Sequence, residues 1–326
     1  MSSVARDRFG VAIWHSGGGI KGRSAARLRQ FGVKPGLDFR VFYKCLTPHA
    51  VYGPHRMVLF HLEALAAITL SLSVLMAFAW LVQRRTGNSG WVDTIWTFSV
   101  GLVGAGGALW PVAGHAPNTR GWLVAALVAI WSLRLGSHIA LRTAHISDDP
   151  RYAAFAAQWG ADAPRKMFFF LQNQALGSIP LVFAIFLAAR FPSDALRPQD
   201  YAGVAILMLG IAGEGLADVQ LKNFRANPAN KGRVCDAGLW RWSRHPNYFF
   251  QWLGWLAYPA IALSPLCPWS PATLLAPLFM YWILVHVTGI PPLEAQMLRS
   301  RGERYRDYQA RTSPFFPWPP SKRAVS

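Results

Sequence analysis

The sequence predicts an all-α membrane protein, a bundle of about seven transmembrane helices. The chain has 326 residues, 52% of them hydrophobic, and a mean hydropathy of +0.21. Its apolar residues are gathered in blocks, each near the roughly 20 residues that a helix needs to cross about 30 Å of hydrocarbon. Several of the 15 tryptophans stand at block ends, where aromatic rings favour the membrane–water interface.

Seven blocks have the required length. The first is an almost uninterrupted apolar run, and the second, third and fifth open near Trp91, Trp122 and Tyr201. The fourth contains Pro180, which a membrane helix tolerates where neighbouring helices surround it. The sixth follows a Pro-Asn pair, and the seventh follows Trp269. The predicted spans are 58–82, 91–112, 121–141, 167–189, 201–221, 248–266 and 271–290.

Lysine and arginine are concentrated in alternate loops, after the first, third, fifth and seventh spans. Because positive loops mark the cytoplasmic side, this pattern places the N-terminus outside and the C-terminus in the cytoplasm. We therefore expect a multi-pass protein of the cell inner membrane. The net charge of +18 would also suit a nucleic-acid binder, but basic cytoplasmic loops explain it more simply, so no nucleic-acid partner is expected.

Residues 1–56 contradict this topology, because they are basic and yet would lie outside. They are rich in glycine and arginine, show no helical or strand period, and contain no apolar core of a signal peptide. We expect a disordered or non-native extension, with translation starting at Met57. Residues 57–326 would then form one membrane domain.

Familiar cofactor motifs are absent from the sequence. Gly17-Gly18-Gly19 does not fit a phosphate loop, because no strand precedes it. Cys45, Cys235 and Cys267 lack CxxC spacing, and no HExxH pair occurs among the histidines. We expect neither a metal cofactor nor a disulfide framework.

Charged residues inside the fifth span form the first candidate site. Glu214, Asp218 and Lys222 are spaced four apart and therefore share one helical face, and Asn223 and Arg225 follow. Ionisable groups at membrane depth are costly and usually mark function. The stripe either lines a cavity that holds a polar ligand or forms an ion pair between helices.

A second polar group stands directly before the sixth span. Arg241, Arg244 and His245 precede a proline, a residue that favours the first turn of a helix. The free N–H groups and positive dipole of that turn suit an anion, and arginine adds a two-pronged donor. The alternative is a set of positive-inside anchors, which explains the arginines but not Asn247 and Tyr248 beside them.

Two further features carry polar residues. Arg134 is the deepest basic residue of the third span, and Asp93 in the second span is its candidate partner. The C-terminal tail contains Glu294, Tyr305 and Tyr308. It fits an amphipathic segment followed by an aromatic and proline-rich stop, and alone it could be an interfacial helix on anionic lipid.

Three segments together resemble the steroid 5-alpha-reductase-like bacterial membrane proteins of the DUF1295 group. They are the stretch from Asp218 to Arg225, the run Arg-His-Pro-Asn-Tyr at 244–248, and Tyr305-x-x-Tyr308. The match covers roughly residues 91–317. The chain is more weakly similar to isoprenylcysteine carboxyl methyltransferases, which share a similar run and a Glu followed by Tyr-x-x-Tyr.

The resemblance implies a seven-helix bundle whose cytoplasmic half holds NADPH. Gln251 stands where relatives commonly carry a glutamate, which puts a contact there in doubt. The cofactor contacts that we expect are Asp218, Lys222, Asn223, Arg225, Arg241, Arg244, His245, Asn247, Tyr248, Tyr305 and Tyr308.

For such a reductase, a hydride would reach an alkene conjugated to a carbonyl, and the protein would supply a donor and a proton. Glu214 and Asp93 are the candidate catalytic residues. The substrate would be a hydrophobic sterol, isoprenoid or acyl lipid that enters from the bilayer. A membrane methyltransferase that uses S-adenosylmethionine and a non-enzymatic lipid-binding protein are the alternatives.

Overall fold

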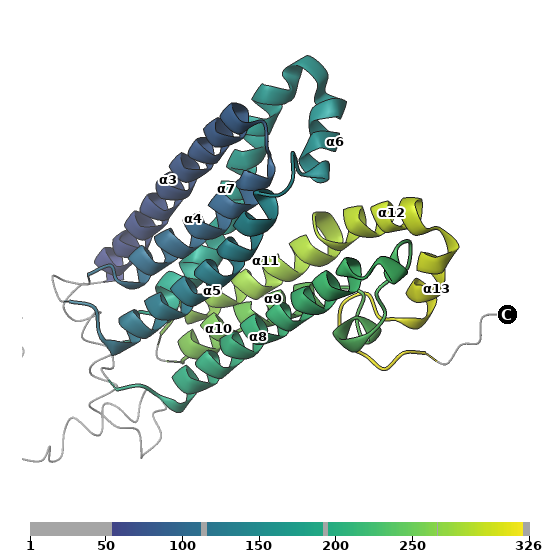
Figure 1. The fold of residues 1–326 in the computed structure, drawn as a ribbon. Coiled ribbons are helices and arrows are strands. Elements are labelled where there is room, and N and C mark those ends of the chain that lie inside the picture. The colour runs from purple at the N-terminus through teal and green to yellow at the C-terminus, as the bar shows by residue number, and fades with distance from the viewer. Residues whose placement is uncertain (1–53, 112–115, 192–194, 266, 322–326) are drawn as a thin grey trace, which may run out of the picture. The chain divides into compact units, whose positions relative to one another are not determined.

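The computed structural model describes residues 54–111, 116–191, 195–265 and 267–321 (Figure 1). The expectations for residues 1–56 concern a segment that lies almost wholly outside this range. The described part of the chain is helical and has no strand, as the apolar blocks predict. Its elements are α3 Pro54–Thr86, α4 Gly90–Ala108, α5 Thr119–Thr143, α6 Pro150–Trp159, η1 Gly160–Asp162, α7 Ala163–Ala188, α8 Pro198–Ala226, η2 Pro228–Asn230, η3 Gly238–Arg241, α9 Pro246–Trp255, α10 Ala257–Ala262, η4 Ser270–Leu274, α11 Leu275–Trp282, η5 Ile283–Val287, α12 Ile290–Arg301 and α13 Glu303–Arg311.

Among the described residues, 5 helical stretches are long and apolar enough to cross a membrane. They contain the first, third, fourth, fifth and seventh predicted spans, so the prediction of a helical membrane bundle is confirmed. The second predicted span forms α4, which has 19 residues. The sixth is divided between α9 and α10, which meet at Leu256.

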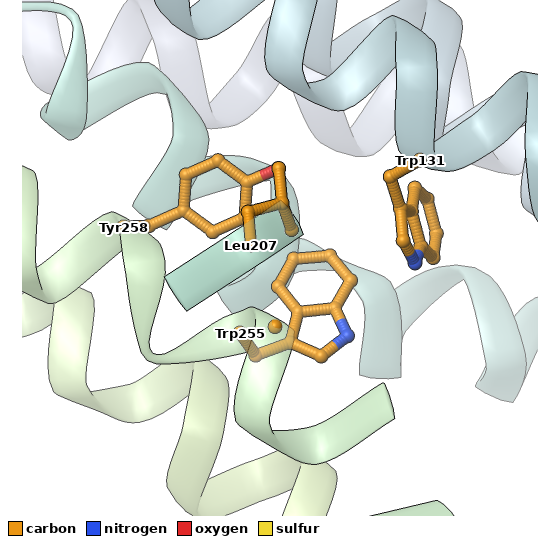
Figure 2. Close-up of a pocket in the computed structure, with 5 residues that line it drawn as sticks. Trp131, Leu207, Trp255 and Tyr258 are labelled. Atoms are coloured by element: carbon orange, nitrogen blue, oxygen red, sulfur yellow. The ribbon is translucent and has the colours of Figure 1, made fainter. Parts of the chain in front are cut away.

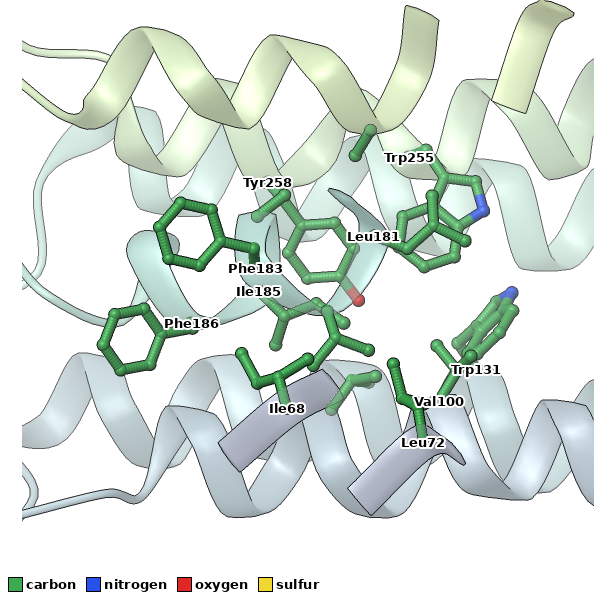
Figure 3. Packing of buried hydrophobic residues seen from close by; sticks show 14 of the residues in the cluster. Ile68, Leu72, Val100, Trp131, Leu181, Phe183, Ile185, Phe186, Trp255 and Tyr258 are labelled. Atoms are coloured by element: carbon green, nitrogen blue, oxygen red, sulfur yellow. The ribbon is translucent and has the colours of Figure 1, made fainter. Parts of the chain in front are cut away.

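The helices pack around a continuous apolar core. Helix α4 lies against α3, α5 and α7, while α8 lies against α9 and α10. Buried aliphatic side chains from different helices interlock in this core, among them Leu72 of α3, Val100 of α4 and Leu181 of α7 (Figure 3). Trp131 of α5 and Trp255 of α9 extend the same core toward α8.

Glycines allow α8 and α9 to approach closely. A Cβ atom at Gly210 would lie 2.8 Å from the carbonyl oxygen of Phe250 and 2.9 Å from Gly254, and one at Gly213 would lie 2.3 Å from the Phe250 ring. Any larger residue at these positions would push the two helices apart. This close contact places the first turn of α9, which begins with the predicted Pro246, beside the charged stripe of α8.

Arginines close the end of the bundle where α5 and α8 begin. Arg120 of α5 is fully buried, and its Nη2 lies 2.7 Å from Oδ2 of the equally buried Asp200 of α8. Arg190 donates to the carbonyl oxygen of Trp110 at 2.7 Å, and Arg197 donates to that of Ile261 at 2.6 Å. These side chains donate hydrogen bonds to backbone carbonyl groups of other segments, and they hold the helices together at this end of the bundle.

Candidate functional site

Helices α5 and α8 run parallel, and a second set of charges joins them beyond the closed end. Arg134 of α5 places Nη2 2.6 Å from Oδ2 of Asp218 and Nη1 2.9 Å from Oε1 of Glu214. The first contact is a hydrogen bond, whereas the second is an ion pair without hydrogen-bond alignment. The side chains of Arg134, Glu214 and Asp218 are 20%, 7% and 13% exposed, so two carboxylates share one largely buried guanidinium. We call these residues the charged trio.

Helix α9 completes the surroundings of the charged trio. Asn247 donates from Nδ2 to Oδ1 of Asp218 at 3.4 Å, and Nε2 of the half-exposed His138 lies 3.7 Å from Oδ2 of the same carboxylate. The structure therefore brings Glu214, Asp218 and Asn247, three of the predicted site residues, to one place between α5, α8 and α9.

The predicted pairing of Arg134 with Asp93 is wrong. Asp93, at the start of α4, instead pairs with Arg151 of α6 and accepts a hydrogen bond from the Tyr152 hydroxyl at 2.8 Å. Arg151 also contacts Asp149, whose Oδ2 lies 2.9 Å from Nη2. Asp93 thus belongs to a separate cluster that fastens α6 to the bundle, and this prediction failed because Asp218, one turn beyond Glu214, faces Arg134 more closely.

Arg244 and His245 also turn away from the charged trio. Arg244 Nε lies 2.6 Å and His245 Nε2 lies 3.2 Å from Oε1 of Glu294 in α12. Gln309 of α13 donates to the other oxygen of Glu294 at 2.7 Å, and Tyr305 interacts with the same carboxylate. The residues around Glu294 form a third polar group, after the charged trio and the cluster around Asp93, and we call it the Glu294 cluster.

Tyr308 holds the backbone that carries the Glu294 cluster. It is buried, and its hydroxyl donates to the carbonyl oxygen of Trp240. The tail adds a backbone hydrogen bond of 2.8 Å from Arg244 N–H to the carbonyl oxygen of Ser313. Burial raises the pKa of Tyr308 above its usual range, so the hydroxyl stays a proton donor. In this structure Tyr308 clamps the loop before α9 and does not face the charged trio.

The remaining predicted contacts form a positive surface at the far ends of α5 and α8. Lys222, Asn223 and Arg225 are exposed on the last turns of α8, and Arg241 is exposed in η3. Arg225 interacts electrostatically with Arg142 of α5 and with Arg301 of α12. Among the described residues, the carboxylate nearest to the guanidinium groups of Arg142, Arg225 and Arg301 is that of Asp149, which lies 3.5 Å from Arg142. Like charges therefore gather where the two parallel helices end.

Tyr248 lies between the polar groups. Its ring stacks on that of His245 with centroids 5.6 Å apart, and it interacts electrostatically with Arg151 and Asp93. One short segment, 244–248, therefore lies among all three groups: Arg244 and His245 pair with Glu294, Asn247 donates to Asp218, and Tyr248 interacts electrostatically with Asp93 and Arg151.

Inward from the charged trio, most of the side chains between α5, α8 and α9 are apolar, and we call this region the apolar seam. Trp131 lies one turn before Arg134 on α5, and its Nε1 donates to Oε1 of the buried Gln251 at 3.1 Å. Gln251 lies one turn after Asn247 on α9. Gln251 thus holds a core indole in place with its neutral amide.

Within the described residues, no group of three or more His, Cys, Asp or Glu side chains is arranged to hold a metal ion.

Acidification should destabilise the protein through His245. Burial lowers the pKa of His245 below its ordinary value of 6.5, against the opposing effect of Glu294. The folded protein therefore holds this histidine neutral, and the associated stability is present above a pH of about 6.5 and is lost as the pH falls below it. We expect the unfolding midpoint of the purified protein to fall between pH 7 and pH 5.5, and less so in His245→Gln. The exposed His145 provides the control, and an equal slope in His245→Gln and His145→Gln would contradict the assignment.

The bundle and its charged site between parallel helices define an integral membrane protein with a polar centre inside the bundle. The chain belongs to the family described as "Protein of unknown function (DUF1295)", whose model matches residues 79–312. This confirms the resemblance to the DUF1295 group drawn from segments 218–225, 244–248 and 305–308, whereas its steroid 5-alpha-reductase-like part stays a prediction. No curated protein and no solved structure matches the chain significantly.

Proposed function

We propose that the protein is an enzyme of the cell inner membrane that uses NADPH to reduce a carbon–carbon double bond in a hydrophobic lipid-like substrate. The observation that carries this proposal is the charged trio, in which Arg134 serves two carboxylates at the border between a positive surface and an apolar seam. Such a border offers adjacent places for a polar cofactor and an oily substrate.

The chain's residues fit a dinucleotide phosphate at the positive surface. Lys222, Arg225 and Arg301 are cationic, and the Nε of Arg301 is a buried donor without a hydrogen-bond partner in the described residues. Guanidinium groups bind phosphate oxygens with two parallel hydrogen bonds. Asn247 and Asp218, deeper in the site, would hold the amide and hydroxyl groups of the cofactor. When bound, NADPH would supply a hydride.

The charged trio is suited to holding a proton. Its two carboxylates face one guanidinium, so at full ionisation one negative charge stays uncompensated at membrane depth, and a single proton on Glu214 or Asp218 removes it. We assign Glu214, the more buried acid, as proton donor to the substrate carbon. Asp93 is the second candidate, although Arg151 and Tyr152 already occupy its oxygens. The surrounding apolar side chains would exclude water from the reaction.

A methyltransferase that uses S-adenosylmethionine is the second candidate. The Glu294 cluster supports it, because it unites Arg244 and His245 with Glu294 and Tyr305, the residue types shared with isoprenylcysteine carboxyl methyltransferases. In this case the ligand would lie at the Glu294 cluster rather than at the charged trio. A non-enzymatic lipid-binding protein is the third class.

The three classes differ in the ligand that stabilises the purified protein. At about 100 times its dissociation constant, a ligand adds about 2.7 kcal/mol to the free energy of unfolding. We expect NADPH to raise the midpoint of thermal unfolding more than NADH or S-adenosylmethionine does, because the positive surface can hold an additional phosphate.

Matched variants locate the site. Arg225→Gln should reduce the stabilisation by NADPH, whereas Arg304→Gln, an exposed change on α13, should preserve it. Stabilisation by S-adenosylmethionine alone would support the methyltransferase, and no stabilisation by any nucleotide would support the third class.

A further inference from the structure

A narrow cavity lies in the apolar seam, deeper in the bundle than the charged trio. Figure 2 shows it between the side chains of Trp131, Leu207, Trp255 and Tyr258, and Gly254 completes the lining. The space free of atoms is about 140 Å³ and is too narrow to admit a water molecule. An end group can therefore enter this space only after one of the lining side chains has turned aside, and a whole lipid cannot enter it.

One wall of the cavity carries a hydrogen-bond donor without an acceptor. Trp255 is only 2% exposed, and its Nε1 has no hydrogen-bond partner among the described residues. Buried indole N–H groups normally find a partner. Other tryptophans of this protein do so: those whose Nε1 donates a hydrogen bond include Trp80, Trp96, Trp131, Trp240 and Trp252. Trp255 is thus an exception among the buried tryptophans that the structure describes, because the other two, Trp131 and Trp240, both donate.

The donor belongs to the same seam as the charged trio. Leu207 precedes Glu214 by two helical turns on one face of α8, which corresponds to about 10 Å along the helix. On α9, Asn247, Gln251 and Trp255 follow one another at intervals of one turn. The rings of Trp131 and Trp255 meet edge to face with centroids 5.2 Å apart, and their nitrogens lie at the same end of the pair (Figure 3). The unpaired N–H therefore lies on a line from the polar centre into the core.

A single residue separates two helices at this point, and its N–H forms a tighter bond than in an α-helix, from Leu256 to the carbonyl oxygen of Leu253. Helix α9 ends at Trp255, and α10 begins at Ala257. Interrupted helices in membrane proteins commonly border ligand sites, because the chain there is not held by a continuous ladder of hydrogen bonds. A rotation of the Leu207 or Trp255 side chain would widen the cavity without moving a helix.

We propose that the Nε1 of Trp255 donates a hydrogen bond to an acceptor oxygen of the hydrophobic ligand, which inserts that end into the cavity. The ligand class is a lipid with a carbonyl group at the end of a long chain or of a ring system, and a pure hydrocarbon is not recognised. The identity of this lipid as the substrate rests on the proposed function, whereas its binding does not.

Binding can be tested without any nucleotide. The probes are two saturated ketones, 2-heptadecanone and cholestan-3-one, each compared with its parent hydrocarbon in detergent micelles. Neither ketone contains an alkene, so binding is observed without turnover. We expect each ketone that fits the cavity to bind about tenfold more tightly than its hydrocarbon, the contribution of one neutral hydrogen bond in a dry site. In Trp255→Phe this advantage should disappear. Trp282→Phe, which changes an indole that is 52% exposed, should preserve it.

A spectroscopic measurement on the unaltered protein guards against a variant that fails to fold. In protein with nitrogen-15-labelled tryptophan, the indole proton of Trp255 should move downfield on addition of a ketone and stay in place with the hydrocarbon. Equal affinities of ketone and hydrocarbon, an unmoved Trp255 signal, or the same ketone preference in Trp255→Phe would each overturn the proposal. Failure of NADPH to bind would leave these results untouched, so the two proposals can fail separately.

Discussion

Replacement of Asp200 by asparagine should destabilise the protein by about 3–5 kcal/mol, the range for a buried ion pair that loses one partner. Arg120 and Asp200 are both fully buried, and Asp200 accepts hydrogen bonds from Nε and Nη2 of Arg120 at 3.0 and 2.7 Å. It also accepts one from the backbone N–H of Arg197 at 2.6 Å. Asparagine keeps the size of the side chain but removes the negative charge, so the guanidinium would stay buried without compensation.

The measurement is the loss of folded protein with temperature in a mild detergent. Glu303→Gln is the control, because it removes a charge from an exposed ion pair with Arg306 and should change little. The double variant Arg120→Met/Asp200→Leu should be more stable than Asp200→Asn, since it removes both charges together. An Asp200→Asn protein that unfolds like the control would show that the pair does not hold α5 to α8.

The sequence predicted the bundle well because apolar blocks of membrane length are a strong local signal. Five predicted spans lie within long apolar helices of the structure. The sixth was predicted as one helix and is divided at Leu256, where the chain turns from α9 into α10 and hydropathy gives no sign of the break. The topology of the termini stays a prediction, because no membrane accompanies the structure.

The charged site was only partly predictable. The four-residue spacing placed Glu214 and Asp218 on one face of α8, which is a local property of helices. Their partner Arg134 lies 80 residues or more away, so its identity depends on which helices are neighbours. Glu294 was not among the predicted site residues for the same reason, because it meets segment 244–248 only when the chain has folded back on itself.

One signal in the sequence did foreshadow the pairing of α5 with α8. Fourteen residues separate Arg120 from Arg134, and the same number separates Asp200 from Glu214. Fourteen residues make about four helical turns, so two parallel helices with these spacings place both pairs in register. Matched spacing of opposite charges in two spans is therefore evidence for adjacent parallel helices, and it would have excluded Asp93 as the partner of Arg134.

The same register explains why charge changes along α5 and α8. Opposite charges meet at the closed end in Arg120 and Asp200, and again at mid-length in the charged trio. At the far ends the facing residues are Arg142 and Arg225, which repel each other. Attraction thus holds the helices together over most of their length, and repulsion leaves their ends suited to an anion.

Arg134→Met should destabilise the protein by about 2–4 kcal/mol, less than the loss of Asp200 because Arg134 keeps some contact with solvent. The change leaves Glu214 and Asp218, which are largely buried between α5 and α8, without their arginine partner. Adding Glu214→Gln should recover part of the loss, since one carboxylate less is left uncompensated. Arg134→Lys should be less stable than the unaltered protein but more stable than Arg134→Met, because an ammonium group keeps the positive charge but lacks the two separate nitrogens with which Arg134 reaches Glu214 and Asp218.

Thermal unfolding of the unaltered protein, Arg134→Met, Glu214→Gln and the double variant, with the exposed change Arg241→Met as control, decides whether the trio acts as a unit. Coupling requires that Glu214→Gln changes the midpoint by different amounts in the presence of Arg134 and in Arg134→Met, with the larger rise in Arg134→Met. If Glu214→Gln has the same effect in both backgrounds, the two side chains are independent and the trio is not a shared site. In that case the proton assigned to Glu214 would lose its physical basis, because nothing would then link its charge to that of Asp218.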